Sequence, residues 1–324
     1  MRSTRRVLAV LPFALLACAA QAQKIAYPTK PVTLIVGSAP GGTTDISARM
    51  LAEPLGKALG QTIVVDNRAG SSDAIAAIAV KRADADGHTL LMQYSGYHVI
   101  TPVVSKQNLG WEAKDLQPVA NVLTAAQVVV VRAGLPFKNM AELIAYAKAN
   151  PGKLTYASSG NGSLQHVTGA MLEQQAGIQM THIPYKGTGP ALQDLLGGQV
   201  DLTFGTAPPF MPHIQSGKLR ALAVTGSTRV SSLPDIPTTA EAGLPKLNPT
   251  SWFAVFAPAA TPKPVVDKLA AEIGRVMATP EFKKKAADLG AAADYLSPAQ
   301  LGELAQAELK RWAEVAKASK IEAD

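Results

Sequence analysis

Two loops rich in glycine and hydroxyl side chains carry the residue types that suit anion binding. One is Pro40-Gly41-Gly42-Thr43-Thr44-Asp45, and the other is Ser158-Ser159-Gly160-Asn161-Gly162-Ser163. Each follows a short apolar run and precedes an amphipathic helical pattern, so each directs the unpaired N–H groups of a helix N-terminus beyond a strand end. Those donors and the positive end of the helix dipole both favour negative charge. The pair of loops therefore predicts an anionic ligand that is held from two sides.

A simpler explanation exists for each loop alone, namely a glycine turn that ends in a Ser or Thr helix cap. The first loop has neither the Gly-Lys-Ser/Thr ending of a phosphate-binding loop nor the G-x-G-x-x-G spacing of a dinucleotide site. One loop by itself does not separate the two explanations. The presence of two loops of the same construction favours a ligand.

The five histidines form no recognised catalytic or metal-binding motif. They are His88, His98, His166, His182 and His213. Neither H-E-x-x-H nor H-x-x-x-H spacing occurs, and no G-x-S-x-G segment indicates a nucleophile elbow. We expect structural roles for the histidines, no metal and no cofactor. His98 and His166 neighbour ligand-type loops, so a Ser–His–acid triad stays open as the enzymatic alternative.

Predicted strands and helices alternate, which places each glycine loop between a strand and a helix. The expected strands are 32–37, 62–65, 89–92, 128–131, 180–183, 200–204, 219–224 and 252–257. The expected helices are 46–59 with a kink or early stop at Pro54, 73–82 capped by Ser72, 140–149, 164–176, 187–196, 208–216 and a helical region from 264 onward. Alternation of this kind predicts parallel sheets with right-handed crossovers.

The last predicted helix has a clear start signal and an apolar face that one charged residue interrupts. Ser297-Pro298-Ala299-Gln300 is a capping box with proline at the first helical position. Leu301, Leu304, Trp312 and Val315 then form one apolar stripe, which Glu308 interrupts.

Three further segments follow predicted strands, at the end where α/β sheets bind ligands. They are 93–98, 185–187 and Gly205-Thr206. Lys186 is a candidate counter-charge for an anion, although a solvated loop lysine explains it equally well.

The first 22 residues have the features of a secretory signal peptide. Residues 2–6 carry three arginines, and 7–17 form an apolar core that is too short to span a bilayer. Ala20-Gln21-Ala22 fits the small-x-small cleavage rule. The only cysteine, Cys18, lies inside this segment, and a lipoprotein cut just before it is the alternative. We therefore expect a periplasmic protein whose usual mature form has no disulfide.

The composition indicates a globular chain with room for two domains. Of the 324 residues, 47% are hydrophobic and 17% are charged, and about 300 remain after cleavage. The net charge of +7 includes three charges of the signal peptide, so the mature excess is small and scattered. The only basic run, 283–285, has the pattern of a solvated helix face, and we expect no nucleic-acid partner.

These motifs together give the chain a clear resemblance to a known family. Over nearly the whole mature chain it resembles the tripartite tricarboxylate transporter substrate-binding proteins, also called Bug receptors. The segments that carry the likeness are YPTKPVTLIV, PGGTTD, GQTIVVDNRAG, ADGHTLL, PGKLTYASSGNGSLQH, HIPYKGTGPALQDLLGGQVDL, GKLRALAVTG, LPDIPTTAEAGLP and SWFAVFAPAATP. Each segment is a modest motif, but their order and spacing together are specific.

The resemblance implies a type II periplasmic-binding-protein fold, in which two α/β lobes are joined by crossing strands and hold an organic acid between them. It places the signal peptide at 1–22, lobe 1 at 23–123 and 252–324, and lobe 2 at 124–251. Both glycine loops and the segment from Tyr94 to His98 then line the cleft. The ligand-binding residues that we predict are Ala39, Gly41, Gly42, Thr43, Thr44, Tyr94, Tyr97, His98, Ser158, Ser159, Gly160, Asn161, Ser163, Gly205 and Thr206.

The chain departs from the usual family pattern in three places. Thr43 stands where a third glycine is common, and 69–73 replaces a glycine-rich stretch after the second strand. Gly205-Thr206 stands where many members have Asp, which removes a partner for a ligand ammonium group and leaves room for a wider ligand. We therefore expect a carboxylate without an ammonium group, with an aromatic dicarboxylate as one candidate. Tyr94, Tyr97 and Phe210 could offer ring faces, although core packing explains Phe210 better.

The function that we predict is that of a non-enzymatic solute receptor, acting as a monomer. Its partners are a small-molecule carboxylate and the membrane subunits of a transporter. A receptor that reports its ligand to a sensor kinase is the first alternative, because both functions use the closed form. A secreted α/β hydrolase with His98 or His166 as general base is the second.

We expect the mature protein to begin at Gln23, because Ala20-Gln21-Ala22 precedes it. Intact-mass measurement on protein from a periplasmic extract checks this start. A lipid-modified mass that begins at Cys18 would instead establish membrane anchoring.

Overall fold

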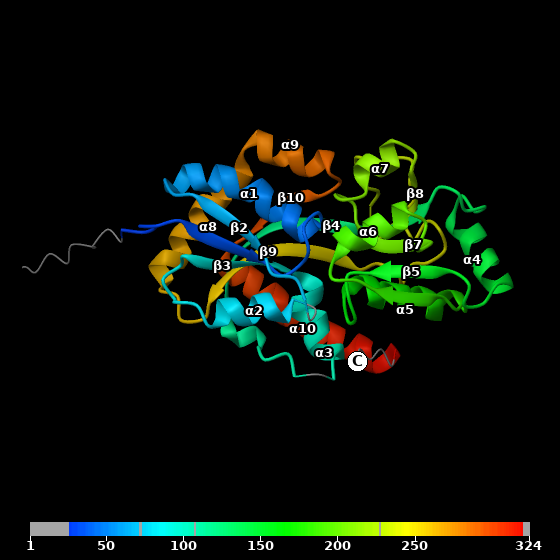
Figure 1. The fold of residues 1–324 in the computed structure, drawn as a ribbon, viewed down its shortest axis with the longest axis horizontal. Coiled ribbons are helices and arrows are strands. Elements are labelled where there is room, and N and C mark those ends of the chain that lie inside the picture. Colours follow the sequence, from blue (N-terminus) through cyan, green and yellow to red (C-terminus); the bar gives the residue numbers. More distant parts are fainter. Residues whose placement is uncertain (1–25, 71–72, 107, 227, 320–324) are drawn as a thin grey trace, which may run out of the picture.

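The computed structural model describes residues 26–70, 73–106, 108–226 and 228–319. The chain forms two α/β lobes that lie side by side and are joined by long strands (Figure 1). The expected signal peptide and Cys18 lie outside the described residues. Among the helices that are described, none is both long and apolar enough to cross a membrane.

The sheet of lobe 1 has a parallel part and an antiparallel part. Its strand order is β2 (Ile63–Asn67), β1 (Val32–Val36), β3 (Thr89–Tyr94), β9 (Thr250–Pro258) and β4 (Leu116–Arg132), with β10 (Ala292–Leu296) also on β4. β1 pairs in parallel with β2 and β3, as the alternating pattern predicts. β9 runs antiparallel to both β3 and β4, which that pattern does not predict.

Lobe 2 repeats this plan on a smaller scale. β5 (Thr155–Ser158) pairs in parallel with β6 (Thr181–Pro184) and β7 (Leu202–Thr206). β7 and β8 (Leu219–Val224) both run antiparallel to β4. In each lobe, the parallel strands are therefore joined to one long antiparallel strand, which is β9 in lobe 1 and β4 in lobe 2.

β4 is the strand that belongs to both lobes. Its residues 116–126 pair with β9, whereas 127–132 pair with β7 and β8. The sequence pattern predicts only 128–131 of this strand, because the earlier part lacks a continuous apolar run. The lobe boundaries expected at 123 and 252 stay a prediction, since β4 and β9 run through them without a break.

Helices cover both faces of each sheet. They are α1 (Thr43–Leu59), α2 (Ala74–Lys81), η1 (Gly96–Ile100), α3 (Thr101–Val104), η2 (Ala113–Asp115), α4 (Met140–Ala149), α5 (Leu164–Ala176), α6 (Thr188–Leu196), α7 (Met211–Gln215), α8 (Lys263–Ala278), α9 (Pro280–Asp288) and α10 (Pro298–Ser319). Figure 1 shows α1 and α9 on one side of the lobe 1 sheet, and α2, α3 and α10 on the other.

Two predictions about helix ends have different outcomes. The early stop at Pro54 is wrong, because α1 continues past this residue to Leu59. The capping box of α10 is confirmed, because the Ser297 N–H donates to Gln300 Oε1 at 3.0 Å and the Gln300 N–H donates to Ser297 Oγ at 3.4 Å. Ser72, the expected cap of α2, lies outside the described residues.

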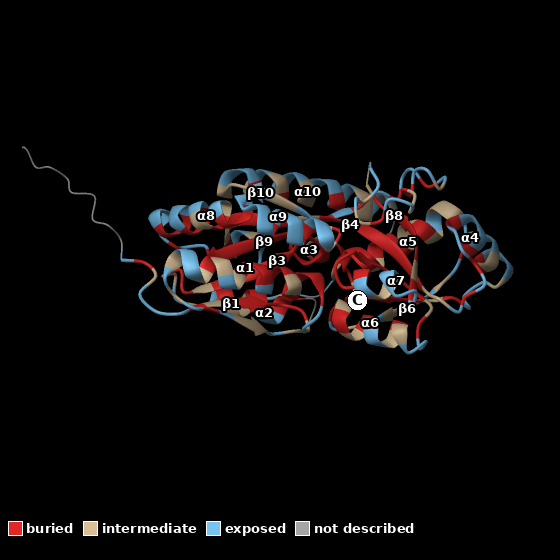
Figure 2. Ribbon diagram, turned by 90° about the horizontal axis from the view of Figure 1, so that it is seen from above, coloured by how far each residue is buried: buried red, intermediate tan, exposed pale blue. Residues whose placement is uncertain are grey.

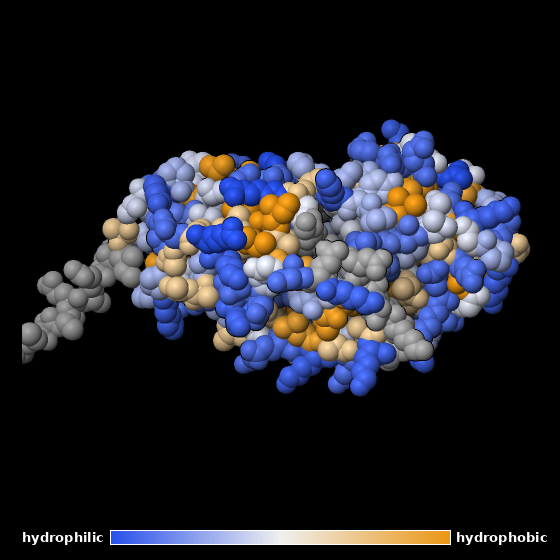
Figure 3. All heavy atoms as spheres, turned by 60° about the horizontal axis from the view of Figure 1, so that its bottom comes forward, coloured by the Kyte–Doolittle hydropathy of each residue, from blue (hydrophilic) through white to orange (hydrophobic). Residues whose placement is uncertain are grey.

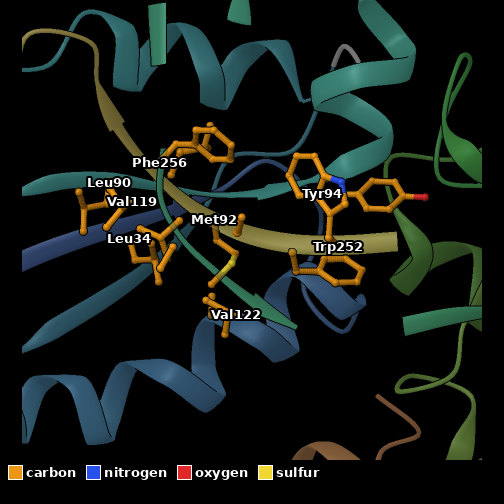
Figure 4. Packing of buried hydrophobic residues seen from close by; sticks show 14 of the residues in the cluster. Leu34, Leu90, Met92, Tyr94, Val119, Val122, Trp252 and Phe256 are labelled. Carbon is orange, nitrogen blue, oxygen red and sulfur yellow. The ribbon is translucent and has the colours of Figure 1, made fainter. Parts of the chain in front are cut away.

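The strands are the most buried part of the molecule (Figure 2). Lobe 1 has one large apolar cluster, in which side chains of β1, β3, β4 and β9 pack together (Figure 4). Lobe 2 has two smaller clusters, to which neighbouring residues of β4 contribute alternately. Large apolar side chains that are exposed are Val64, Ile75 and Tyr295, and the hydrophobic patches on the face in Figure 3 are small and separate.

Glu308 interrupts the apolar stripe of α10 because it bonds to β9. The indole Nε1–H of Trp252 donates to Glu308 Oε2 at 3.1 Å. Burial raises the pKa of the Glu308 carboxyl, while this hydrogen bond lowers it. The pair fixes α10 to β9.

We expect Glu308→Ala to lower the free energy of unfolding by about 1–3 kcal/mol, because it leaves the buried Trp252 N–H without its acceptor. Urea unfolding measures this change, with Glu314→Ala as the control at an exposed position of the same helix. Equal stability of the two variants would contradict a role for the indole–carboxylate bond.

Candidate ligand-binding site

The two lobes meet around a small inner cavity at the carboxyl ends of β3 and β7. Its volume is about 10 Å³. The lining residues are Ser38, Gly42, Thr43, Thr44, Tyr94, Tyr97, Ser159, Gln165, Thr188, Thr206 and Phe253. Lobe 1 supplies the first turn of α1, and lobe 2 supplies residues at the starts of α5 and α6. Residues at the starts of three helices therefore line this cavity, whereas the sequence predicted two.

Direct polar contacts hold the lobes together around this cavity. Thr43 Oγ1 and Thr206 Oγ1 share a hydrogen bond of 2.6 Å. The Tyr97 hydroxyl donates to the Ser159 carbonyl at 2.6 Å, and the Ala39 N–H donates to the Lys186 carbonyl at 3.2 Å. The conformation is therefore a closed one.

Glycines allow the backbones of the two lobes to approach each other. A Cβ on Gly42 would lie 3.6 Å from Thr188 Cβ, in ordinary contact across the cleft. A Cβ on Gly189 would lie only 2.1 Å from the Pro40 carbonyl oxygen. Gly189 is thus required for this degree of closure, and the sequence analysis did not single it out.

A polar network beneath the first loop fixes its shape. The Gly41 N–H donates to Asp45 Oδ2 at 3.0 Å, and Arg49 Nε bonds to both oxygens of the same carboxylate. Asn67 Nδ2 donates to the Ser38 carbonyl and to Asp45 Oδ1, each at 3.0 Å. The N–H of Gly41, one of the predicted ligand-binding residues, is therefore engaged within the loop. The N–H groups of the first turn of α1 have no partner inside the helix.

The second loop is shaped by its own side chains. Ser163 caps α5 by accepting from the His166 N–H at 3.4 Å, and the Gly162 N–H donates to His166 Nδ1 at 3.2 Å. Ser159 Oγ bonds to Gln165 Oε1, and Gln165 Nε2 donates to Thr188 Oγ1 at 3.1 Å. Gln165 was missed by the sequence analysis because it lies past the glycine segment, on the helical pattern.

His98 does not face the cleft. Its side chain is 2% exposed and stacks on Phe256 with ring centroids 4.3 Å apart, beside Trp111 and Trp252. Desolvation by this core lowers the pKa of His98 to about 3, so the ring is neutral at ordinary pH. In this core position, His98 does not contact a ligand in the cleft and does not serve there as a general base.

His182 and His166 form a stacked pair behind the second loop. Their ring centroids are 4.0 Å apart, and Ser158 Oγ and His182 Nε2 are 2.6 Å apart. Burial, together with the neighbouring His166, lowers the pKa of His182 to about 3. Ser158 is 1% exposed and lines neither cavity at the lobe interface. Among the described residues, no group of three or more His, Cys, Asp and Glu could hold a metal ion.

Gly205 has a packing role that the sequence analysis did not foresee. A Cβ at this position would lie 2.5 Å from the Phe210 ring. The Phe210 side chain is fully buried in a core cluster of lobe 2. The room that we expected beside Gly205 for a wider ligand is therefore taken by Phe210.

A larger cavity of about 470 Å³ adjoins the inner one, with Tyr97 and Ser159 lining both. Its other lining residues are Gly37, Gly70, Asp73, Ala74, Ile75, Ile78, Thr101, Ser105, Asn108, Leu109, Gly160, Asn161, Pro184, Tyr185 and Lys186. It lies between the lobes and takes residues from both. Of the predicted site residues, Ala39, Gly41, His98, Ser158, Ser163 and Gly205 line neither cavity.

This fold and cleft define a two-lobe binding protein of the periplasmic type. A family model described as "Tripartite tricarboxylate transporter family receptor" matches residues 47–321, and the chain belongs to this family. The family resemblance inferred from the motifs is thereby confirmed.

Solved structures agree with this assignment. Periplasmic binding protein BugD is 37% identical, with a TM-score of 0.87 over 92% of this chain and 100% of that one. Rpa4515 of R. palustris, solved with adipate, is 36% identical, with a TM-score of 0.89 over 91% and 99% of the two chains. MatC of Rhodopseudomonas palustris, with bound malate, is 33% identical, with a TM-score of 0.85 over 89% and 99%.

Proposed function

We propose that this protein is a periplasmic receptor that captures a small organic carboxylate between its lobes and delivers it to a tripartite tricarboxylate-type membrane transporter. Membership of the receptor family supports the transport role. The similar structures that contain adipate and malate support a carboxylate as the ligand.

The observation that supports this proposal most is the convergence of the starts of α1, α5 and α6 on the inner cavity. Unpaired N–H groups and helix dipoles both favour a negative group there. The hydroxyl groups of Thr43, Thr188 and Thr206 add donors that can turn toward it. One carboxylate of the ligand is therefore proposed to bind at this point.

The energy available at such a site is adequate for a receptor. Micromolar affinity corresponds to about 8 kcal/mol, and a hydrogen bond to a charged group contributes about 1.5–3 kcal/mol. Several such bonds, with apolar contact along the larger cavity, reach that value. Because the inner cavity of about 10 Å³ has room for no more than one water molecule, the lobes must part to admit a ligand.

An aromatic dicarboxylate remains a candidate ligand, but two of the features that favoured it, an accessible Phe210 ring and free space beside Gly205, are absent from the described structure. Phe210 packs in the core and fills the space beside Gly205. Tyr94 and Tyr97 line the inner cavity, and their rings meet edge to face with centroids 5.2 Å apart. Of the three rings named from the sequence, these two line the inner cavity, and Phe253 lines it as well.

We expect a panel of small carboxylates to raise the melting temperature of the wild-type protein. A ligand at 100 times its dissociation constant stabilises a fold by about 2.7 kcal/mol. The panel contains amino acids, adipate, malate, succinate, benzoate and the phthalate isomers.

Gly42→Leu should lose the response while remaining folded. The φ of −81° at Gly42 suits any residue, but a leucine side chain would meet Thr188 across the cleft.

A protein that is stabilised by no carboxylate, or a Gly42→Leu variant that responds as the wild type does, would contradict the site. Recovery of the ligand after incubation separates a receptor from the hydrolase alternative, since a receptor releases its ligand unchanged. Uptake by cells that carry the transporter subunits separates transport from signalling.

We expect Gly189→Ala to weaken binding of the best panel member at least tenfold, because the new methyl group meets the Pro40 carbonyl oxygen only in the closed form. Small-angle scattering at saturation should give a larger radius of gyration for this variant than for the wild type. Gly302→Ala is the matched control, since this helical glycine has only an ordinary contact with Pro118. A wild-type radius in Gly189→Ala would contradict closure around the ligand.

A further inference from the structure

Asp73 is an acidic residue in a conformation that normally belongs to glycine. It precedes α2 with a φ of 73° and is the one non-glycine residue of positive φ in the described part of the chain. Asp and Asn tolerate this region better than other side chains do. A carboxyl group thus stands on a backbone conformation that glycine adopts most readily.

The Asp73 side chain extends toward β1 and does not cap its own helix. No side-chain hydrogen bond from it caps α2. A Cβ built on Gly37 would lie 0.9 Å from Asp73 Oδ1, so the carboxyl group occupies the place that any side chain at position 37 would take. Gly37, at the end of β1, is therefore what admits this carboxyl group.

The carboxyl group is buried and incompletely bonded. Asp73 is 2% exposed, and its Oδ2 atom has no hydrogen-bond partner in the described structure. Burial raises the pKa of Asp73 well above its usual range. A buried polar atom without a partner calls for an explanation, and one beside a cavity can take its partner from a bound molecule.

Asp73 lies on the path that a bound ligand would take. It lines the cavity of about 470 Å³ between the lobes, which shares Tyr97 and Ser159 with the inner cavity. Ala74, Ile75 and Ile78 line the same cavity and suit the hydrocarbon part of a ligand. A molecule that is anchored by a carboxylate at the inner cavity thus brings its other end toward Asp73.

We propose that Asp73 determines ligand specificity by accepting a hydrogen bond from a donor group, such as a hydroxyl, amide or ammonium group, at the end of the ligand opposite the anchoring carboxylate. This inference rests on the proposed function. A donor satisfies the Oδ2 atom whether or not the Asp73 carboxyl is ionised. A hydrogen-bond donor also favours the ionised form of the Asp73 carboxyl, and beside that ionised form a second ligand carboxylate would meet a like charge in a site of low dielectric. The acidic partner that the sequence lacks at Gly205 is thus supplied from the other lobe.

The test compares ligands that differ only at the far end, at pH 7.5. The six-carbon series is adipate, 6-hydroxyhexanoate, 6-aminohexanoate and adipamate, and the four-carbon series is succinate, 4-hydroxybutyrate, 4-aminobutyrate and succinamate. Calorimetry measures each dissociation constant. We expect the tightest donor-bearing member of one series to bind at least tenfold more tightly than the dicarboxylate of the same length.

Asp73→Gly and Asp73→Asn both suit the positive φ, so both should fold. Asp73→Gly should reduce the preference for the donor-bearing member to threefold or less, and Asp73→Asn should reduce the preference for 6-aminohexanoate or 4-aminobutyrate at least tenfold. Asp66→Asn is the control, because it removes a carboxylate that pairs with Arg68 outside the cavity, and it should keep the wild-type ratio.

A wild-type protein that prefers the dicarboxylate, or a ratio that Asp73→Gly leaves unchanged, would overturn this inference while carboxylate binding stands. If neither the wild type nor Asp73→Gly binds any member of the two series or of the wider carboxylate panel, the proposed function fails and this inference with it.

Discussion

The fold depends on one strand that must satisfy hydrogen bonds in two lobes at once. β4 pairs with β9 over residues 116–126 and with β7 and β8 over 127–132. Its backbone cannot break between these partners without leaving buried N–H and C=O groups unpaired. We therefore expect relative motion of the lobes to bend β4 where its partners change. There the Gln127 N–H donates to Thr225 Oγ1 at 2.8 Å, and Gln127 Nε2 donates to Ser251 Oγ at 2.5 Å.

Local patterns predicted the parallel parts of both sheets and the order of their helices, because those segments contain short apolar runs that alternate with amphipathic helical patterns. The crossing strands were harder. The first half of β4 and the strand β10 are defined by pairing with distant segments, which no local pattern encodes. Pro54 shows a second limit, since the tertiary packing of α1 outweighs the local cost of a proline within the helix.

The site was predicted in outline from its glycine loops, and the outcome for individual residues depended on what each faces. Gly42, Thr43, Tyr97 and Ser159 line the cavities as expected. His98 follows the same strand end as Tyr97 but turns into the core, and a sequence does not indicate such a change of face within a helical turn. Gln165, Thr188 and Asp73 reach the cleft from helix starts that only the folded chain brings together.

The contacts that close the lobes consist of hydroxyl pairs, carbonyl groups and bare backbone. Each of these groups bonds to water almost as well as to its present partner, so the contacts give closure direction and little strength. Direct contacts of this kind therefore hold the closed conformation only weakly. In the proposed function, the fraction of time that the lobes spend closed then depends mainly on the bonds that a bound ligand makes to both of them.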